Sequence, residues 1–344
     1  MFMTILIVII GIAVLILIHE WGHFIAAKKM GLLVEEFGFG FPPRLFSVKK
    51  GETTYSFNLL PFGGFVKIYG EDSGARPGQS ELHPNDPKRA FYSQSFLRRA
   101  AIITAGVIMN FVLGWFLMSS IFMIGTPKAL LVSEILPGSP AEAVGIAARD
   151  QIRGFKSAED FIEFVNKNRG TEIALEINRA GEELSFAVIP SISGEGAVGV
   201  GLVEAGVERQ PLFAALWNGL AASVSIMIGI ILAFANLIWG LVTSGRVLVD
   251  FVGPIGIFGV AQQVGELGFL YVVQLVALIS LNLAVLNIMP FPALDGGRLL
   301  FILIEKIKGS PLSADFERAA NTFGFVLLLL LMIAITARDI VRLL

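Results

Sequence analysis

The amino-acid sequence predicts a polytopic α-helical membrane protein with four transmembrane helices, a membrane-associated β-hairpin and one inserted extracytoplasmic α+β domain. Three observations predict this class. Hydrophobic residues make up 55% of the 344 residues and charged residues only 16%, and the mean hydropathy is +0.75. Long apolar runs lie toward both ends of the chain. Between residues 127 and 205, charged residues return at the density of a water-soluble protein.

The composition also limits what the protein binds. The formal net charge of -2 gives no indication of a nucleic-acid partner, and the lipid bilayer is the expected surrounding. The chain has no cysteine, so any zinc ion must be held by His, Asp or Glu.

The first apolar run, residues 4–27, carries the motif HEWGH at 19–23, and we expect a retained first span rather than a cleaved signal. Residues i and i+4 share one face of a helix, so His19 and His23 can bind one metal ion from the same side. Glu20 is then placed to take a proton from a water that the metal activates. Ionisable side chains are costly inside the hydrocarbon of a membrane, so their presence there indicates a function. The alternative is that the helix ends here and extends these polar side chains to the membrane interface.

The segment between the first two spans is basic, which predicts a cytoplasmic loop by the positive-inside rule. Its residues 38–44, GFGFPPR, are rich in turn formers and exclude a helix. Two strand-like stretches around LPFGG at 60–64 predict a β-hairpin over residues 53–69, close to the metal-binding end of the first span. Such a hairpin offers an edge to which an unfolded substrate adds as a strand, and an ordinary cytoplasmic hairpin is the alternative.

The second span covers residues 98–124 and contains two features of packed membrane helices. Ala105 and Gly106 favour the close approach of another helix. Asn110 carries an amide that needs a hydrogen-bond partner at this depth. We expect both features to serve helix packing.

Residues 127–205 show strand and helix patterns that predict one small α+β domain. The domain resembles a PDZ domain, most clearly in SPAEAVGI at 139–146 and DQI at 150–152. The sequence departs from that pattern at Val144, where alanine is usual, and at Arg149, where glycine is usual. The resemblance implies a PDZ-like fold with a groove for a peptide ligand.

The apolar stretch 212–242 is long enough to span a membrane, yet we expect an interfacial or re-entrant helix there. The argument is one of parity. A first span running inward and a second running outward place the PDZ-like domain outside. The next span must start on that outer side if its far end is to meet His19 and His23, and a crossing at 212–242 would reverse the order.

The third span, residues 269–289, runs into the sequence NIMPFPALDGG at 287–297. Its prolines and glycines unwind the helix near the inner membrane face, which is tolerated only where protein shields the backbone or a polar cavity receives it. Asp295 then lies at the depth of His19. The last span covers residues 322–337.

Catalytic zinc takes three protein ligands and keeps one position open. His19 and His23 supply two ligands, and Asp295 is the best-placed candidate for the third. The metal lowers the pKa of its water toward neutrality, so that Glu20 can take the proton and pass it to the leaving amine. Asn287 can hydrogen-bond the substrate carbonyl or the backbone, and a helix-packing amide is the alternative.

Together these motifs resemble the site-2 protease family of intramembrane zinc metalloproteases, and most closely the bacterial regulator-of-sigma-E proteases. The match rests on HEWGH and residues 287–296, and it extends to the segments 38–40, 61–64 and 253–256 and to the PDZ-like insertion. The resemblance implies one Zn²⁺ per chain, with His19, His23 and Asp295 as ligands and Glu20 as catalytic acid/base. It also implies a substrate-binding surface that contains Asn287, Gly63, Gly64, Pro290 and Pro292.

By that resemblance the chain is a multi-pass protein of the bacterial cytoplasmic (inner) membrane, with the PDZ-like domain outside and the active site toward the cytoplasm. Residues 1–125 and 206–344 form the two halves of the membrane protease core, and the PDZ-like domain, 127–205, is inserted between them. The implied partners are single-span membrane proteins, either anti-sigma factors or remnant signal peptides, cut in regulated intramembrane proteolysis.

Two features depart from the family pattern. The chain has one PDZ-like domain where the best-known members carry two, and Val107 stands where proline is common. The alternative from another class is a membrane-anchored PDZ peptide-binding adaptor with a silent metal site. Glu20 and all three presumed ligands are intact, which favours the enzyme because a silent site need not keep them.

Overall fold

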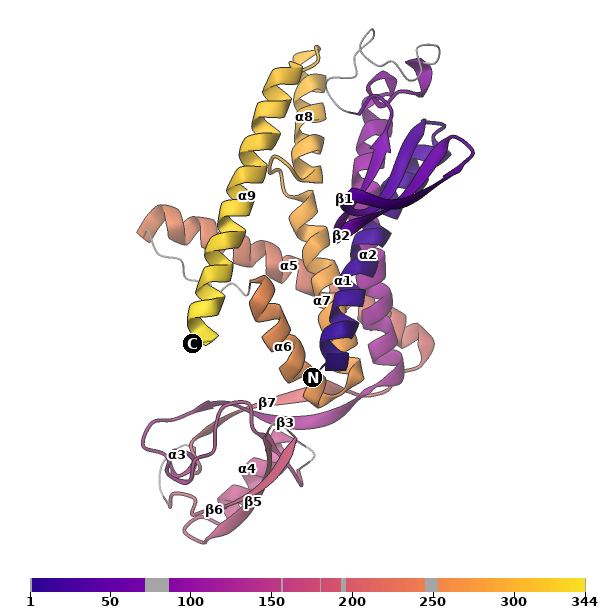
Figure 1. Cartoon of the computed structure of the whole chain (residues 1–344). Coiled ribbons are helices and arrows are strands. Elements are labelled where there is room, and N and C mark those ends of the chain that lie inside the picture. Colours follow the sequence, from indigo (N-terminus) through magenta and orange to yellow (C-terminus); the bar gives the residue numbers. More distant parts are fainter. Residues whose placement is uncertain are drawn as a thin grey trace. The chain divides into compact units, whose positions relative to one another are not determined.

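The apolar runs of the sequence form long helices in the computed structural model, which describes residues 2–71, 87–155, 157–179, 181–192, 196–244 and 253–343 (Figure 1). Within these ranges, five helices are long and apolar enough to cross a membrane: α1 (Phe2–Lys29), α2 (Phe96–Ile124), α5 (Leu212–Ser244), α7 (Phe269–Ile288) and α9 (Ala314–Leu343). The chain is therefore compatible with a polytopic membrane protein.

Four of these helices, α1, α2, α7 and α9, correspond to the four predicted spans, and α5 is the additional candidate for a membrane crossing. It is one unbroken helix of 33 residues, and almost none of its apolar span is buried inside the protein. Because the helix has no break, a re-entrant turn within residues 212–242 does not form. An interfacial helix and a crossing are the two arrangements that its length permits.

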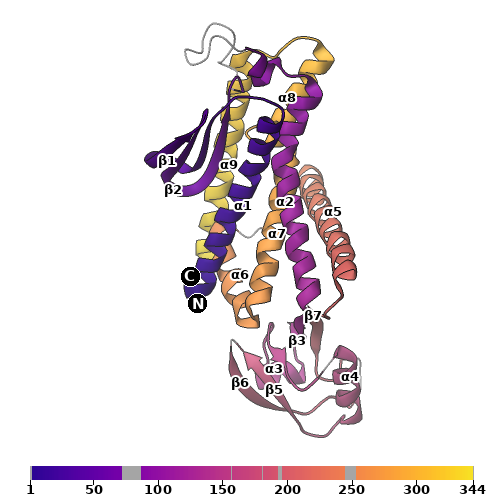
Figure 2. The ribbon, with the colours of Figure 1, turned by 90° about the vertical axis from the view of Figure 1, so that its right-hand side faces the viewer.

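Contacts divide the chain into two compact units, of which the first comprises Met1–Met118, Gly219–Gln262 and Val272–Leu344. In this unit α1, α2 and α7 pack side by side (Figure 2). α1 and α7 run parallel, since Val8 packs with Val272 and His19 lies near Asn287 further along both helices. α2 runs antiparallel to them.

Two shorter helices complete the first unit: α6 (Pro254–Leu267) and α8 (Asp295–Lys308). α6 packs against α1 and α7 in a buried cluster of Val8, Ala261 and Val272. Near the end of α9, the buried carboxylate of Asp339 accepts a hydrogen bond from the backbone N–H of Gly256 (2.8 Å). This contact ties α9 to the beginning of α6.

The loop between α1 and α2 forms two long antiparallel strands, β1 (Val34–Lys50) and β2 (Thr53–Ile68). The prediction of a hairpin within residues 53–69 is wrong, because its two strand-like stretches do not pair with each other. Both belong to β2, and both pair with the same part of β1. Phe37 lies opposite Tyr55 on one side and Val66 on the other. The turn-rich residues 38–44 are part of β1.

The physical reason for this pairing is strand curvature. Register shifts bend both strands, so that they form four neighbouring segments in the order 64–68, 34–39, 54–57 and 46–50. Gly40, with a φ of +79°, lies where β1 bends. Among the described residues, segment 64–68 pairs with β1 on one side only and therefore forms an edge of the sheet.

One carboxylate ties the turn between β1 and β2 to the end of α1. Oε1 of Glu52 accepts hydrogen bonds from Nη2 of Arg89 (2.7 Å) and from Nζ of Lys28 (2.6 Å). Arg89 ends the short helix η1 (Pro87–Arg89). The guanidinium of Arg89 and the ammonium of Lys28 lower the pKa of the Glu52 carboxyl to about 2.

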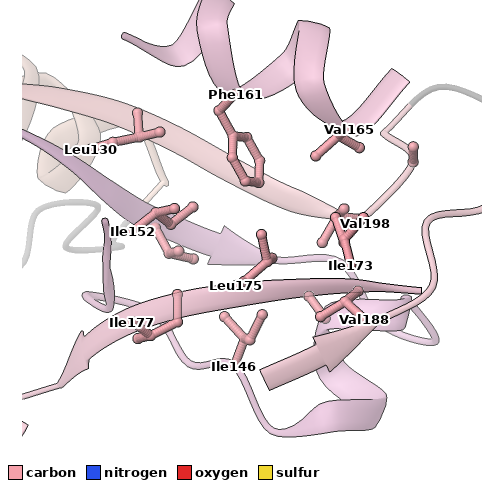
Figure 3. Close-up of a cluster of buried hydrophobic side chains, with 13 residues drawn as sticks. Leu130, Ile146, Ile152, Phe161, Val165, Ile173, Leu175, Ile177, Val188 and Val198 are labelled. Carbon is pink, nitrogen blue, oxygen red and sulfur yellow. The ribbon is translucent and has the colours of Figure 1, made fainter. Parts of the chain in front are cut away.

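The second unit, Ser119–Asn218 and Gln263–Tyr271, contains an antiparallel sheet with the strand order β6-β5-β4-β3-β7. Its elements are β3 (Thr126–Ile135), α3 (Pro140–Val144), β4 (Gln151–Ile152), α4 (Ala158–Lys167), β5 (Ile173–Arg179), β6 (Glu182–Val188) and β7 (Val200–Val207). Apolar side chains of the sheet and of α4 form its core, including Leu130, Phe161 and Leu175 (Figure 3). The strand and helix patterns of residues 127–205 thus form one α+β sheet-and-helix unit with its own core.

A buried aspartate fixes the corner before β4. Asp150 is 1% exposed and accepts hydrogen bonds from Nε and Nη2 of Arg179, both at 2.7 Å, and from the backbone N–H of Ala147. The preceding Arg149 has a φ of +76°, a left-handed conformation that favours glycine. The ion pair therefore holds a corner whose backbone is strained at one residue.

We predict that Glu52→Gln lowers the free energy of unfolding at neutral pH by about 0.5–1 kcal/mol, because the ion pairs are partly exposed and screened by solvent. A carboxyl whose pKa falls on folding stabilises the protein above its ordinary pKa of 4.5, and this contribution is lost as the pH falls to about 2. Thermal unfolding of both proteins in detergent should therefore differ at neutral pH and converge over this interval. A difference that stays constant would contradict the role of this carboxylate.

Candidate metal centre

Three side chains from distant parts of the sequence meet in the first unit. His19 and His23 come from α1, and Asp295 is the first residue of α8. Oδ2 of Asp295 lies 3.1 Å from Nε2 of His19 and 3.2 Å from Nε2 of His23. The two Nε2 atoms are 3.2 Å apart. These three atoms form a nearly equilateral triangle between largely buried side chains.

Helix α1 and its neighbour α2 set the orientation of the two imidazoles. The rings lie edge to face, with centroids 4.8 Å apart, as expected for residues one helical turn apart. Nδ1 of His23 donates a hydrogen bond to the carbonyl oxygen of Ile102 in α2 (2.9 Å). Because a carbonyl only accepts, Nδ1 of this ring carries a proton, and Nε2 is the nitrogen that faces Asp295.

An irregular connection between α7 and α8 places Asp295. Residues 289–294 are not helical, and Ala293 has a φ of +74°. A Cβ on Gly296 would lie only 2.1 Å from the carbonyl oxygen of Met289, so this close passage of the chain requires glycine. The prolines and glycines of the motif thus end one helix and start the next with the carboxylate facing α1.

Gly106 of α2 lies against both imidazoles. A Cβ at this position would lie 2.3 Å from Nε2 of His23 and 2.8 Å from Cε1 of His19. Any side chain there would displace the rings. The sequence pattern indicated helix packing at Gly106, and the structure shows that the space is taken by the two histidines.

Two asparagine amides lie against His19 from different helices. Nδ2 of Asn287, in α7, is 3.4 Å from Nε2 of His19, the ring nitrogen that belongs to the triangle. Nδ2 of Asn110, in α2, is 3.3 Å from Nδ1 of the same ring. Asn287 was expected to line the site, whereas Asn110 was expected to serve packing. The polarity of Asn110 inside an apolar helix was the signal that could have found it.

Glu20 lies next to the edge of the sheet. A Cβ on Gly64 would lie 2.9 Å from Cγ of Glu20, so the backbone of β2 passes close to this side chain. Gly63, with a φ of +128°, precedes it in β2. Pro290 and Pro292 lie in the connection between α7 and α8. The substrate-binding role of these residues stays a prediction.

The triangle has the size that a zinc ion requires. Zn²⁺ binds imidazole nitrogen and carboxylate oxygen at about 2.0–2.2 Å in a tetrahedron, so its ligand atoms lie about 3.3 Å apart. The three separations in the structure are 3.1, 3.2 and 3.2 Å. Two histidines and one carboxylate are also a ligand set of catalytic zinc, which keeps a fourth position open. The residues therefore fit the ion.

A metal-binding group with an adjacent glutamate, carried by an apolar helix, is typical of a membrane-bound metallopeptidase. The chain belongs to peptidase family M50, whose family model matches residues 7–331. This match includes both parts of the triangle, the histidines of α1 and the aspartate of α8.

Known relatives carry corresponding names. The chain is 34% identical to a protein of Clostridium perfringens that is provisionally named a zinc metalloprotease, over 98% of the chain and 99% of the relative. It is 30% identical to the zinc metalloprotease RasP of Oceanobacillus iheyensis and 28% identical to the regulator of sigma-W protease RasP of Bacillus subtilis, over 99% of each chain. The protein is thus a zinc metalloprotease.

We predict that Gly106→Ala lowers the zinc content of the purified protein at least about tenfold, because the new Cβ takes the position of the His23 ring. Gly229→Ala is the matched control, since Gly229 also lies in an apolar helix and a Cβ there meets no described atom within 4 Å. Elemental analysis after gel filtration measures the effect, and circular dichroism checks the helices. Full zinc content in the Gly106 variant would contradict the close approach of α2.

Proposed function

We propose that the chain is a zinc-dependent intramembrane endopeptidase, which hydrolyses peptide bonds within or near the transmembrane segments of single-span membrane proteins. The observation that carries the proposal is the triangle of His19, His23 and Asp295 beside Glu20, on a helix apolar enough to cross a membrane. A reaction centre at membrane depth meets substrates that are themselves in the membrane. One Zn²⁺ per chain occupies the triangle in this proposal.

The residues around the triangle have separate tasks in hydrolysis. A zinc ion held by the three ligands supplies a Lewis acid that makes water a better nucleophile. Glu20 takes the proton of the attacking water and delivers it to the nitrogen of the leaving amine. The amide of Asn287 donates a hydrogen bond to the oxygen of the scissile carbonyl, where negative charge develops.

The substrate binds as an extended strand along segment 64–68 of β2. Hydrolysis needs an unwound chain, because a membrane helix satisfies and shields its own backbone groups. Support comes from the position of this segment at an edge of the sheet and from the approach of Gly64 to Glu20. A peptide added to that edge gains backbone hydrogen bonds and passes Glu20. Gly63, Pro290 and Pro292 belong to the same surface in this proposal.

The sheet is membrane-associated. Several of its apolar side chains are exposed, which supports contact with lipid or with an apolar substrate. These side chains are Phe41, Leu45, Phe46, Val48, Leu59 and Leu60.

Four helices, α1, α2, α7 and α9, cross the membrane in this proposal, and α5 makes no net crossing. The directions of the packed helices support this. α1 and α7 run parallel, with Val8 beside Val272 and His19 beside Asn287, so α7 starts on the side where α1 starts. α2 is antiparallel to α1 and runs toward that same side, so the chain between α2 and α7 makes no net crossing. The basic β1–β2 loop lies on the other side, in the cytoplasm.

Residues 127–205 form a PDZ-like domain outside the bacterial cytoplasmic membrane. The left-handed Arg149 before the buried Asp150 supports the resemblance, since PDZ domains have glycine at that position. A domain inserted between the second and third spans limits access by substrates with intact ectodomains. The substrates are anti-sigma factors or remnant signal peptides. One relative is named a regulator of sigma-W protease, which favours regulated proteolysis.

We predict that Glu20→Gln keeps its zinc and loses about 10²- to 10⁴-fold in cleavage rate, because no other group at this position exchanges the proton. The assay follows cleavage of a tagged single-span substrate with a short ectodomain in liposomes. Wild-type protein treated with a chelator, and the same protein after zinc is added back, are measured for comparison. Glu163→Gln, an exposed change on α4, is the matched control. Equal cleavage by Glu20→Gln would contradict the role of Glu20, and a zinc-loaded wild type that cuts no such substrate would favour the peptide-binding adaptor.

Removal of residues 128–204 tests the role of the PDZ-like domain. We expect the shortened protein to cut substrates with intact ectodomains, which the full chain leaves uncut, because the domain no longer restricts their access. Short-ectodomain substrates should be cut at the rate of the full chain and serve as the control. Unchanged selectivity between the two kinds of substrate would refute this role.

A further inference from the structure

The amide of Asn110 is buried in contact with the metal-binding group. The residue is 1% exposed, and its Nδ2 lies 3.3 Å from Nδ1 of His19. Its Oδ1 is also buried and has no hydrogen-bond partner in the described part of the chain. A buried amide with an unpaired oxygen destabilises a protein, whereas a small apolar residue would pack here without that cost. Helix packing alone therefore does not explain the asparagine.

The two ring nitrogens of His19 face different partners. Nε2 faces Oδ2 of Asp295 and Nε2 of His23, so it is the nitrogen directed at the metal position. A neutral imidazole that binds a metal through Nε2 carries its proton on Nδ1. That proton points at Asn110 and requires an acceptor. In the present orientation of the amide, the nearest atom is Nδ2, which is a donor.

Rotation of the amide by half a turn removes this mismatch, because it exchanges Oδ1 and Nδ2 at nearly unchanged shape. We infer that Asn110 is a positioning residue, whose Oδ1 accepts the Nδ1 proton of His19 and holds this ring in its zinc-binding tautomer. Without metal, Nδ2 donates to Nδ1 instead, and the Nε2 proton of His19 faces Asp295. Asparagine carries both an acceptor and a donor on one group and so serves both states. The inference rests on the proposed zinc site.

His23 shows the same arrangement with a fixed partner. Its Nδ1 donates to the carbonyl oxygen of Ile102, which can accept but never donate. Each histidine of α1 thus has its second nitrogen paired with a group of α2, as metal-binding histidines commonly do. The partner of His19 differs in being a side chain, which can be replaced without changing the backbone.

The position of Asn110 is held from both sides. Oγ of the fully buried Ser280 in α7 donates a hydrogen bond to the backbone carbonyl of Asn110 (2.7 Å). One turn later on α2, a Cβ on Gly114 would lie 2.6 Å from Cδ2 of Leu281, so α2 and α7 are in close contact there. These contacts fix the backbone of α2 at Asn110, while the side-chain amide can still rotate.

The test is the zinc affinity of the full-length protein in detergent, measured by competition with a chelator of known affinity. Asn110→Leu removes the donor and the acceptor at similar volume, whereas Asn110→Asp keeps an acceptor in the same place. Ser119→Ala is the matched control, because Ser119 is another buried polar residue of α2 and its Oγ has no partner among the described residues. We expect zinc to bind about 10- to 100-fold more weakly to the leucine variant, and at least as tightly as wild type to the aspartate variant.

Two results would overturn the inference and leave the proposed function intact. One is an Asn110→Leu variant that binds zinc as tightly as wild type and Ser119→Ala. The other is an Asn110→Asp variant as weak as Asn110→Leu, which would indicate a packing role that any change disturbs. His19→Ala separates the two proposals: if it leaves the zinc affinity of the wild-type chain unchanged, the proposed metal site fails and the role of Asn110 fails with it.

Discussion

The burial of one charged metal-binding group among apolar helices is the constraint on which the rest of the structure depends. Two imidazoles and a carboxylate are costly in a membrane unless each has a partner, and the helices are built to supply these partners. In the proposed zinc site, α1 provides two ligands one turn apart. α2 comes close enough to pair both rings only because residue 106 is glycine. α7 ends early, so that Asp295 can start a new helix facing α1.

The same group is linked to the arrangement of the β1–β2 sheet and of α8. β2 returns to α1 and passes Glu20 at Gly64, which brings an open sheet edge to the candidate metal centre. α8 is fixed at its other end by a partly buried ion pair, in which Arg99 of α2 donates to Glu305 (2.8 Å). The helix that carries Asp295 is therefore held at both ends, which favours a rigid ligand geometry. Rigid support of this kind is what a catalytic metal site needs.

Much of this arrangement could be predicted from the sequence, because its signals are local. The spacing of His19 and His23 defines a helix face, and the prolines before Asp295 together with the glycines after it mark the unwound end of the third span. The pairing of β2 could not be predicted, since the register of a bent strand depends on contacts with β1 that no short pattern encodes. Asn110 stood out in the sequence, but its contact with His19 could not be predicted, because a lone amide in a membrane helix has the same pattern whether it packs or positions a ligand.

X-ray absorption at the zinc edge tests the central claim most directly, because it reports the ligands of the ion independently of activity. The account predicts nitrogen and oxygen ligands at about 2.0–2.1 Å in fourfold coordination, with the scattering of two imidazoles. Asp295→Asn should weaken binding and change this spectrum. A spectrum with one imidazole or none, or one that Asp295→Asn leaves unchanged, would contradict a zinc site built from His19, His23 and Asp295.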